Sequence, residues 1–294
     1  MRISLQTPGE ADLDEVVEAL ASWQVDGAPV QLHPGDLGWH WRFEAAAVAA
    51  SVRVWRRGGE IAAVGFLDAP ALLRMGISPR AAGDESLAAH VVDDLADPGA
   101  GVLPHGPAGV EARAGDALRA RLGACGWRPD EPWTPLRHDL QRLDGAADLG
   151  LEVEVVTPNG PPELIADRVA VHRAAFAGST LTPHAWRVMA AAPGYAQARC
   201  LVGRDATGTA VAAVTVWSAG PGRPGLVEPM GVHRDHRGRG HGRAITLAGV
   251  EAMRTLGCSS AVVATPSDNR GAVATYVAAG FRAEEPVTDF GRQG

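Results

Sequence analysis

The feature of this sequence that most limits its possible folds is a glycine-rich loop between a predicted strand and a predicted helix. The strand covers residues 227–232, the helix covers 243–256, and the loop includes Arg237-Gly238-Arg239-Gly240-His241-Gly242. Glycine lets a backbone approach a bulky anion closely. A helix that begins there presents unpaired N–H groups and the positive end of its dipole. The pattern therefore predicts a phosphate-binding turn on an α/β scaffold.

The charges around this loop favour an anionic ligand. Four arginines stand against the single Asp235, in a chain whose net charge is −7: Arg234, Arg237, Arg239 and Arg243. A solvated basic turn is the alternative, since short glycine patterns also arise by chance. The loop is not a P-loop, because Gly242 is followed by arginine instead of Lys-Ser/Thr. His233, His236 and His241 lie in the same segment, but the arginines would repel a cation, so we predict no metal site.

The strand before the loop carries a carboxylate at a predicted irregularity. Glu228, Met230 and Val232 share one face by the period of two. Pro229 cannot donate to a ladder, which predicts that the strand is bulged or splayed there. Glu228 is then either a functional carboxylate beside an opening in the sheet, or an edge-strand charge or structural ion pair.

A strand around 261–263 and a helix over 269–279 complete this segment. Asp268 or Asn269 can cap the helix, and Tyr276 lies on its apolar face. The residue types alone leave two interpretations of Tyr276 open: core filler or functional hydroxyl.

Together these residues resemble the GNAT superfamily of acetyl-CoA-dependent N-acyltransferases. The resemblance covers about residues 225–282 and rests on Glu228 to Val232, the glycine loop, and the helix that runs from Asn269 through Tyr276 to Gly280-Phe281. It implies an α/β (α+β) fold, with a mixed, mostly antiparallel central sheet flanked by helices. It also implies an acyltransferase that moves an acetyl group from acetyl-CoA to a primary amine of a small molecule.

The resemblance further implies a role for each residue. The loop backbone would hold the coenzyme A pyrophosphate, and the splayed strand would hold the pantetheine arm. The coenzyme-binding residues that it implies are Met230, Val232, Arg237, Gly238, Arg239, Gly240, His241, Gly242, Arg243 and Asn269. An alkyl amine is protonated at neutral pH, so a base helps; Glu228 is the candidate, directly or through water. Tyr276 is the candidate acid for the leaving thiolate.

The two halves of the chain look like copies of one unit. Each begins with a strand, Thr-Pro and a helix. Met75-Gly76-Ile77 resembles Met230-Gly231-Val232, and Gly126-Trp127 resembles Gly280-Phe281. We therefore predict two tandem domains, 1–145 and 146–294, with a linker over 144–150.

The predicted first domain lacks the residues that could do chemistry. Aligned on Met75, it has Leu73 opposite Glu228 and Glu85 opposite Gly240, and aligned on Gly126 it has Leu122 opposite Tyr276. We predict a degenerate, non-catalytic domain that completes the core and walls the acceptor cleft, with one coenzyme bound per chain.

A loop is predicted over residues 31–44, and it carries three aromatic residues: Trp39, Trp41 and Phe43. Two interpretations stay open for them. They are core aromatics, or they form part of the acceptor wall.

Composition limits the remaining classes. Of the 294 residues, 46% are hydrophobic, enough for a packed core, and the net negative charge argues against nucleic-acid or polybasic membrane binding. Three widely spaced cysteines suit reduced thiols. The N-terminus lacks an apolar signal core. We expect a cytoplasmic protein, monomeric or homodimeric.

Two alternatives concern what the chain acts on. Tandem GNAT chains include mycothiol synthase, whose segment is similar to Arg243-Ala244-Ile245-Thr246-Leu247-Ala248-Gly249, although the first half shows no clear match. The acidic net charge favours a cationic acceptor, such as an antibiotic or polyamine-like amine. A non-catalytic acyl-CoA sensor is the second alternative, but a sensor needs neither Glu228 nor Tyr276.

Overall fold

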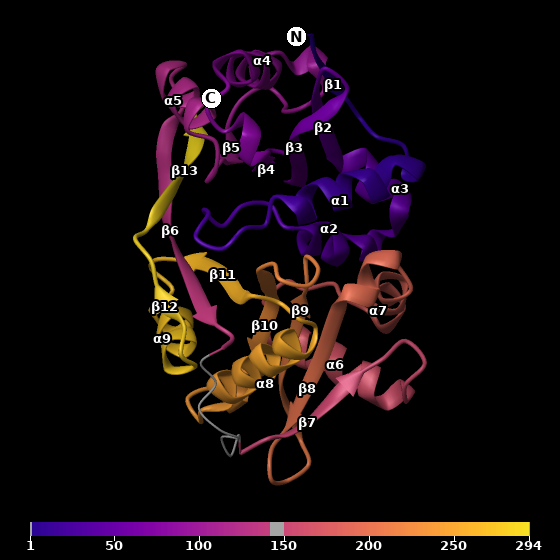
Figure 1. Ribbon diagram of the computed structural model, residues 1–294. Coiled ribbons are helices and arrows are strands. Elements are labelled where there is room, and N and C mark those ends of the chain that lie inside the picture. Colours follow the sequence, from indigo (N-terminus) through magenta and orange to yellow (C-terminus); the bar gives the residue numbers. More distant parts are fainter. Residues whose placement is uncertain (1, 142–149, 294) are drawn as a thin grey trace.

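The computed structural model describes residues 2–141 and 150–293. Most of the predicted linker, 144–149, lies outside the described residues. The chain folds into two α/β halves (Figure 1), and the sheet continues from one half into the other. Among the described residues, no helix is both long and apolar enough to cross a membrane.

In the first half, three α-helices lie between the first strand and the remaining strands. Its strands are β1 (Ile3–Gln6), β2 (Val52–Arg57), β3 (Glu60–Ala69), β4 (Leu72–Ile77), β5 (Ala108–Glu111) and β6 (Arg128–Asp139). Its α-helices are α1 (Leu13–Ser22), α2 (Pro34–His40), α3 (Glu44–Ser51), α4 (Glu85–Ala96) and α5 (Asp116–Ala124).

The second half repeats this order of elements. Its strands are β7 (Glu152–Val156), β8 (Ala198–Arg204), β9 (Ala210–Trp217), β10 (Gly225–Val232), β11 (Ser260–Pro266), β12 (Arg282–Ala283) and β13 (Val287–Arg292). Its α-helices are α6 (Pro162–Ala175), α7 (Pro183–Ala190), α8 (His241–Thr255) and α9 (Arg270–Ala278). The predicted strand, glycine loop and two helices of this segment are all present.

The two halves exchange their last strands. The sheet order is β1-β2-β3-β4-β5-β13-β6-β11-β10-β9-β8-β7, so β6 of the first half pairs with β11 of the second. That pairing is antiparallel from Asp139↔Ser260 to Trp133↔Pro266. In turn β13 inserts between β5 and β6, with Phe290 opposite Val110. Figure 1 shows β6 running down into the second half and the C-terminus lying in the first. The boundary near residue 145 therefore divides the chain without dividing the sheet.

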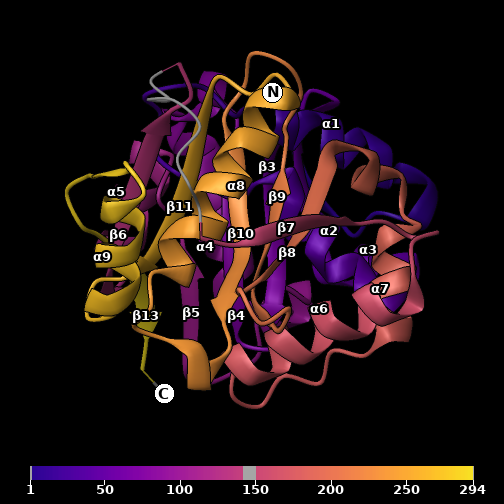
Figure 2. The same cartoon turned by 90° about the horizontal axis from the view of Figure 1, so that it is seen from below.

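Helices cover both faces of each half of the sheet. In the first half, α4 and α5 pack on one face and α1 to α3 on the other, over separate apolar clusters. In the second half, α8 and α9 cover one face and α6 and α7 the other. Figure 2 shows α8 and α6 on opposite sides of β8 to β10. The mixed, mostly antiparallel sheet with flanking helices confirms the predicted fold class.

The prediction of a loop over 31–44 is wrong, because this segment forms α2 and a short 3-10 turn, Trp41–Phe43. Two glycines lower its intrinsic helix propensity. Tertiary packing overrides that preference, since a Cβ on Gly35 or Gly38 would lie 2.5 Å from the ring of Trp217. The helix start is also capped, because the His33 Nδ1 accepts from Gly35 N (2.9 Å) and Asp36 accepts from His33 N (2.7 Å). Helix α2 of the first half thereby packs against Trp217 on β9 of the second half.

A buried ion pair holds the exchanged strand β13. Arg113 donates to both carboxylate oxygens of Asp289, at 3.2 and 2.7 Å, and both side chains are almost fully buried. Removing one partner of such a pair leaves a buried charge without compensation, which is strongly destabilising.

We expect Arg113→Leu to lower the free energy of unfolding by about 3 kcal/mol, measured by chemical denaturation at neutral pH. The matched control is Arg254→Leu, which breaks an exposed ion pair with Glu251 and should leave the unfolding midpoint unchanged. Equal effects of the two substitutions would contradict the structural role of the buried pair.

Candidate active site

The strand before the glycine loop diverges from its neighbour. Strand β10 pairs with β9 from Leu226 to Val232, with a register shift between Val227 and Met230. Its parallel pairing with β11 covers only Gly225 and Leu226. The prediction of an irregular strand at Pro229 is therefore confirmed. The indole of Trp217 donates a hydrogen bond of 2.7 Å to the backbone oxygen of Glu228, which fixes the backbone at the irregularity.

A cavity of about 370 Å³ opens where the strands diverge. Both halves line it: Asp68, Arg74 and Glu111 belong to the first half, and Glu228, Asn269 and Tyr276 to the second. A second cavity, of about 430 Å³, shares Glu228 and Pro229 and is bordered by Trp39, Phe43 and Phe176. Trp41 does not line either of these two cavities. Of the three aromatic residues with two open interpretations, Trp39 and Phe43 thus border the space next to Glu228, whereas Trp41 packs against the apolar cluster under α1 to α3.

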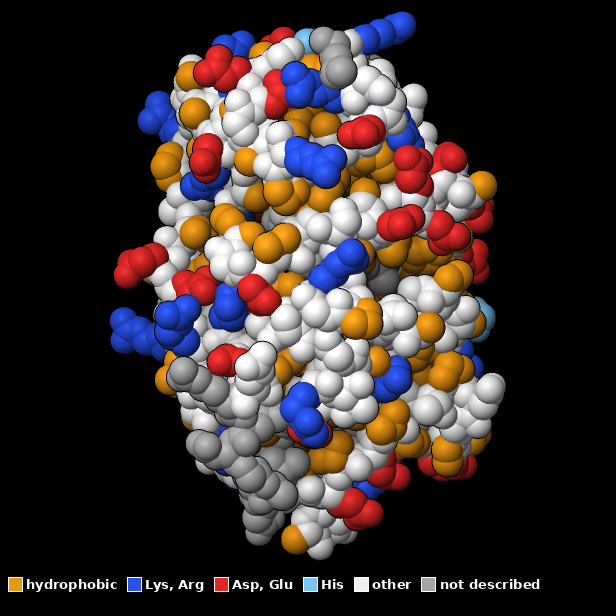
Figure 3. Space-filling view, viewed as in Figure 1, with side chains coloured by type: hydrophobic (Ala, Val, Ile, Leu, Met, Phe, Trp, Pro, Cys, Tyr) orange, Lys and Arg blue, Asp and Glu red, His pale blue; other side chains and the backbone are white. Residues whose placement is uncertain are grey.

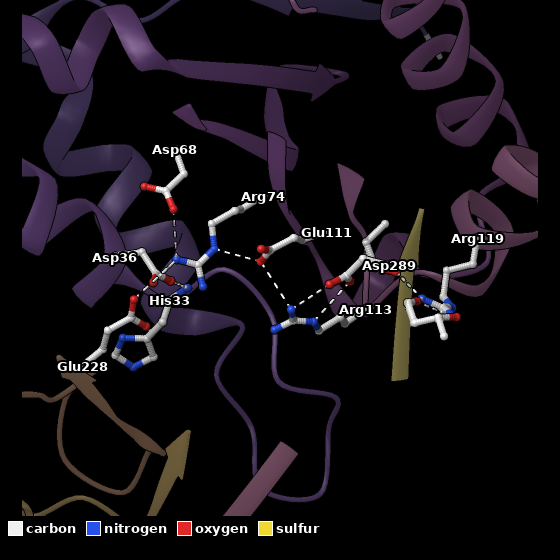
Figure 4. Close-up of polar contacts among 11 residues, drawn as sticks. His33, Asp36, Asp68, Arg74, Glu111, Arg113, Arg119, Glu228 and Asp289 are labelled. Atoms are coloured by element: carbon white, nitrogen blue, oxygen red, sulfur yellow. Dashed lines mark hydrogen bonds and ion pairs between the residues drawn. The ribbon is translucent and has the colours of Figure 1, made fainter. Parts of the chain in front are cut away.

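Glu228 sits at the junction of these two cavities. Its Oε1 lies 3.8 Å from Nη1 of Arg74 (Figure 4), and 38% of its side-chain surface is exposed. Burial in the recess between the halves raises its pKa to about 7. Arg74 acts in the opposite direction, and Asp36, Asp68 and Glu111 add to the rise. Glu228 is therefore a carboxyl group that changes its charge close to neutral pH.

Arg74 is the centre of a charged network that joins four elements of the first half, α2, β3, β4 and β5, to β10. It donates to Asp36 (2.8 Å) and to Glu111 (2.9 Å), and it lies 3.9 Å from Asp68. Figure 4 shows the four carboxylates converging on this one guanidinium, with Glu111 leading on to Arg113. None of these four first-half residues is predicted from the sequence, since they are separated along the chain and no local pattern connects them.

Tyr276 presents a buried hydroxyl to the same cavity. The residue is 5% exposed, packs in the core of the second half, and lines the cavity that contains Glu228. Within the part of the chain that the structure describes, no group forms a hydrogen bond with this hydroxyl. Burial, together with the charge of Glu228, raises the pKa of Tyr276. The hydroxyl thus stays protonated at neutral pH and is available as a donor.

Asn269 begins the helix that carries Tyr276. Its side-chain oxygen accepts from the backbone N–H of Ala272 at 3.2 Å, as predicted for a cap. Gly242, at the start of α8, lies against this helix, because a Cβ there would be 2.9 Å from Thr275 Cγ2. This close approach places the glycine loop directly beside the tyrosine helix.

The glycine loop has the backbone that its sequence predicts. Gly238 and Gly240 have positive φ angles, 74° and 85°, a region that other residues enter with strain. Helix α8 begins at His241, and no side chain caps it, so its first N–H groups remain available to an anion. Arg237 donates to the backbone oxygen of Ala175 (2.8 Å) and Arg243 to that of Ala278 (2.9 Å). These two arginines brace the loop, while Arg239 is exposed.

In the first half the strand that corresponds to β10 is β4, and residues 31–32 form hydrogen bonds with its backbone. Leu32 N donates to Met75 O (3.3 Å), and Ile77 N donates to the Gln31 side chain (2.8 Å). Met75 and Ile77 correspond to Met230 and Val232 of the second half. Residues 31–32 therefore occupy backbone positions that are left open in β10.

The N-terminus of the next helix, α4, is also unavailable to an anion, because a side chain already caps it. Helix α4 is capped by Asp84, whose carboxylate accepts from Leu87 N at 3.1 Å. Asp84 is thus the structural counterpart of Gly240, one residue before the Glu85 that the sequence alignment placed there. A carboxylate at this position would repel a phosphate.

Comparisons with known proteins agree with this geometry. Residues 169–281 match the family model described as the acetyltransferase (GNAT) family. A tandem GNAT protein from the clavulanic acid biosynthesis pathway has a TM-score of 0.63 at 16% identity, covering 99% of this chain and 98% of that one. A GNAT-family acetyltransferase from Colwellia psychrerythraea has a TM-score of 0.62 at 14% identity, covering 100% of both chains.

One curated relative is similar in sequence. Mycothiol acetyltransferase from Saccharopolyspora erythraea is 33% identical over 72 residues. That match spans 24% of this chain and 24% of the relative. The whole-chain architecture is thus that of tandem GNAT proteins. The match to the GNAT acetyltransferase family lies in the second half of the chain, and the chain as a whole shares the fold of these solved structures.

The raised pKa of Glu228 can be measured without a substrate. We expect the side-chain carboxyl ¹³C resonance that disappears in Glu228→Gln to titrate with a pKa of about 7. The physical reason is the burial of the carboxyl group among three further carboxylates. A titration near the ordinary pKa of 4.5 would show that the attraction of Arg74 and the hydration of the carboxylate outweigh the effect of burial.

Proposed function

We propose that this protein transfers an acetyl group from acetyl-CoA to a primary amine of a small molecule by direct attack. One observation carries the proposal. A carboxyl group that titrates near neutral pH and a buried, unpartnered tyrosine hydroxyl line one cavity, at the point where β10 and β11 diverge. The open start of α8 lies beside them, which supports an acyl donor that carries phosphates.

In this proposal the coenzyme follows the glycine loop into the gap between the strands. The N–H groups from Gly238 to Arg243 hold the pyrophosphate. The backbone of Met230 and Val232, beyond the last pairing with β11, holds the pantetheine arm. Asn269 borders the cavity at the thioester end. The acetyl group then lies between Glu228 and Tyr276.

Glu228 is the proposed base. An amine with a pKa of about 10.4 must lose a proton before it attacks, at a cost of about 4.6 kcal/mol at pH 7. A carboxylate with a pKa of about 7 is a much better acceptor for that proton than an ordinary glutamate. Because only its ionised form acts as base, the rate rises as the pH increases through about 7.

Tyr276 is the proposed acid. The amine nitrogen forms a bond to the acetyl carbon, and a backbone N–H near Met230 stabilises the resulting oxyanion. The carbon–sulfur bond then breaks, and the thiolate takes a proton from the Tyr276 hydroxyl. The attacking nitrogen loses its second proton as the amide forms, and an equivalent proton returns Tyr276 to its neutral form. Burial keeps that hydroxyl protonated until the thiolate forms.

The first half is proposed to be non-catalytic. The hydrogen bonds from residues 31–32 to β4, together with the acidic cap of α4, support this part of the proposal. Its contribution is the wall of the cavity opposite Glu228, including Asp68 and Arg74.

A mycothiol-synthase-like acceptor is the alternative substrate, and the local similarity to mycothiol acetyltransferase favours it. An acyl-CoA sensor is the alternative class, which thiol release without stimulation by any acceptor would favour.

We also propose a cytoplasmic location, without a nucleic-acid or membrane partner, as a monomer or homodimer. Arginine and acidic side chains are interspersed on the face shown in Figure 3, which supports the absence of a nucleic-acid partner.

The acid role is tested by Tyr276→Phe. We expect kcat to fall by about a hundredfold, while acetyl-CoA binding changes little, since only the proton donor is lost. The readout is release of free thiol from acetyl-CoA in the presence of an amine.

The chain offers a matched control, because its other tyrosine, Tyr195, is also buried but lies outside the cavity. Tyr195→Phe should keep kcat within about twofold of the parent. Unchanged turnover in Tyr276→Phe would remove the acid from the mechanism.

A further inference from the structure

We propose that the acceptor carries a second positive charge, which Asp68 of the first half binds while Glu228 receives the reacting amine. The acceptor is then a short diamine, and the degenerate half of the chain selects it. This inference rests on the proposed acyl transfer and adds the substrate class and a residue that determines specificity.

The first observation is that the four carboxylates around Arg74 are not equivalent. Asp36 and Glu111 are hydrogen-bonded to the guanidinium and are 2% and 12% exposed. Asp68 and Glu228 lie farther away, at 3.9 and 3.8 Å from the same Nη1, and are 41% and 38% exposed. Two of the carboxylates are therefore structural, and the other two keep oxygens free for a ligand (Figure 4).

The charges around the cavity leave an excess of negative charge. Asp36 and Glu111 more than balance Arg74, and Arg113 is shared between Glu111 and Asp289. Arg42 borders the adjoining cavity, where its guanidinium stacks 4.7 Å from the ring of Trp39 and 4.3 Å from that of Phe43. Asp68 and Glu228 thus interact with the charges of Arg74 and Arg42, but neither has a hydrogen-bonded cation among the described residues. Carboxylates still outnumber the arginines around this cavity, and such a field attracts cations.

A further observation indicates that this cavity is built for a polar ligand. The Tyr276 hydroxyl is 5% exposed, lines the cavity, and has no hydrogen-bond partner within the described ranges 2–141 and 150–293. Buried hydroxyls are normally hydrogen-bonded. Because the Tyr276 hydroxyl is absent from the buried atoms that lack a partner, it is open to the cavity, where water or a polar ligand can bond to it.

The nearness of the two carboxylates to one another favours a short acceptor. Both lie less than 4.0 Å from one Arg74 nitrogen, so they flank a single guanidinium. The reacting amine must become neutral before it attacks, so it no longer offsets the negative charge of Asp68. A second ammonium group on the acceptor offsets that charge in addition to Arg74 and Arg42. A carboxylate at the far end of the acceptor would instead be repelled by Asp68.

The test compares three acceptors of similar length in the thiol-release assay: putrescine, butylamine and γ-aminobutyric acid. Each has a primary amine on a chain of three methylene groups, and they differ in the group at the far end: protonated aminomethyl, methyl or carboxylate. We expect kcat/KM for putrescine to exceed that for butylamine by about tenfold, with γ-aminobutyric acid lowest.

The variants assign this preference to Asp68. Asp68→Asn should lower kcat/KM for putrescine about tenfold and bring the ratio of putrescine to butylamine close to one. Asp68→Glu should retain the preference because it keeps the charge. The matched control is Asp14→Asn, an identical change at an exposed position on α1, which should alter neither value.

The pH profile gives a readout that a merely structural role would not move. Asp68 raises the pKa of Glu228, so Asp68→Asn should shift the rising limb of kcat/KM to lower pH. Equal rates with putrescine and butylamine in the parent, or an unchanged ratio in Asp68→Asn, would overturn the diamine inference and leave acyl transfer intact. If no amine stimulates thiol release, the proposed function fails and this inference fails with it.

Discussion

The exchange of β6 and β13 is the constraint on which the rest of the structure depends. Because β6 pairs with β11 and β13 pairs with β5, neither half completes its sheet with its own last strand. The exchange brings the ends of β3, β4 and β5 to the point where β10 leaves β11. The cavity that holds Glu228 and Tyr276 is therefore formed by both halves. The first half therefore supplies part of the wall of this cavity.

The two halves share one order of elements but differ in hydrogen bonding at corresponding backbone positions. In the first half, residues 31–32 form hydrogen bonds with the backbone groups of Met75 and Ile77, and Asp84 caps the following helix. In the second half, β10 leaves β11 after Leu226, and glycine takes the cap position. Each of the changes that closes the first site uses ordinary hydrogen bonding. These contacts support the proposal that the first half keeps the fold without binding a coenzyme.

The sequence predicts those parts of the site that depend on local chemistry. Pro229 removes a ladder donor and Gly240 permits a positive φ, so the divergent strand and the open helix start follow from single residues. Helix α2 escapes prediction because its stability comes from packing on Trp217 instead of propensity. The network of Asp36, Asp68, Arg74 and Glu111 escapes it because the strand exchange, which no local pattern encodes, brings these residues to Glu228. The proposed roles of Glu228 and Tyr276 stay predictions.

The central claim is that the second half alone binds acetyl-CoA, while the first half is occupied by its own chain. Isothermal titration calorimetry of the intact protein with acetyl-CoA tests this claim most directly. The account predicts one binding event per chain, which Gly240→Asp abolishes because it places in the second half the carboxylate that Asp84 places in the first. Two equivalent sites per chain, or full binding in Gly240→Asp, would contradict it.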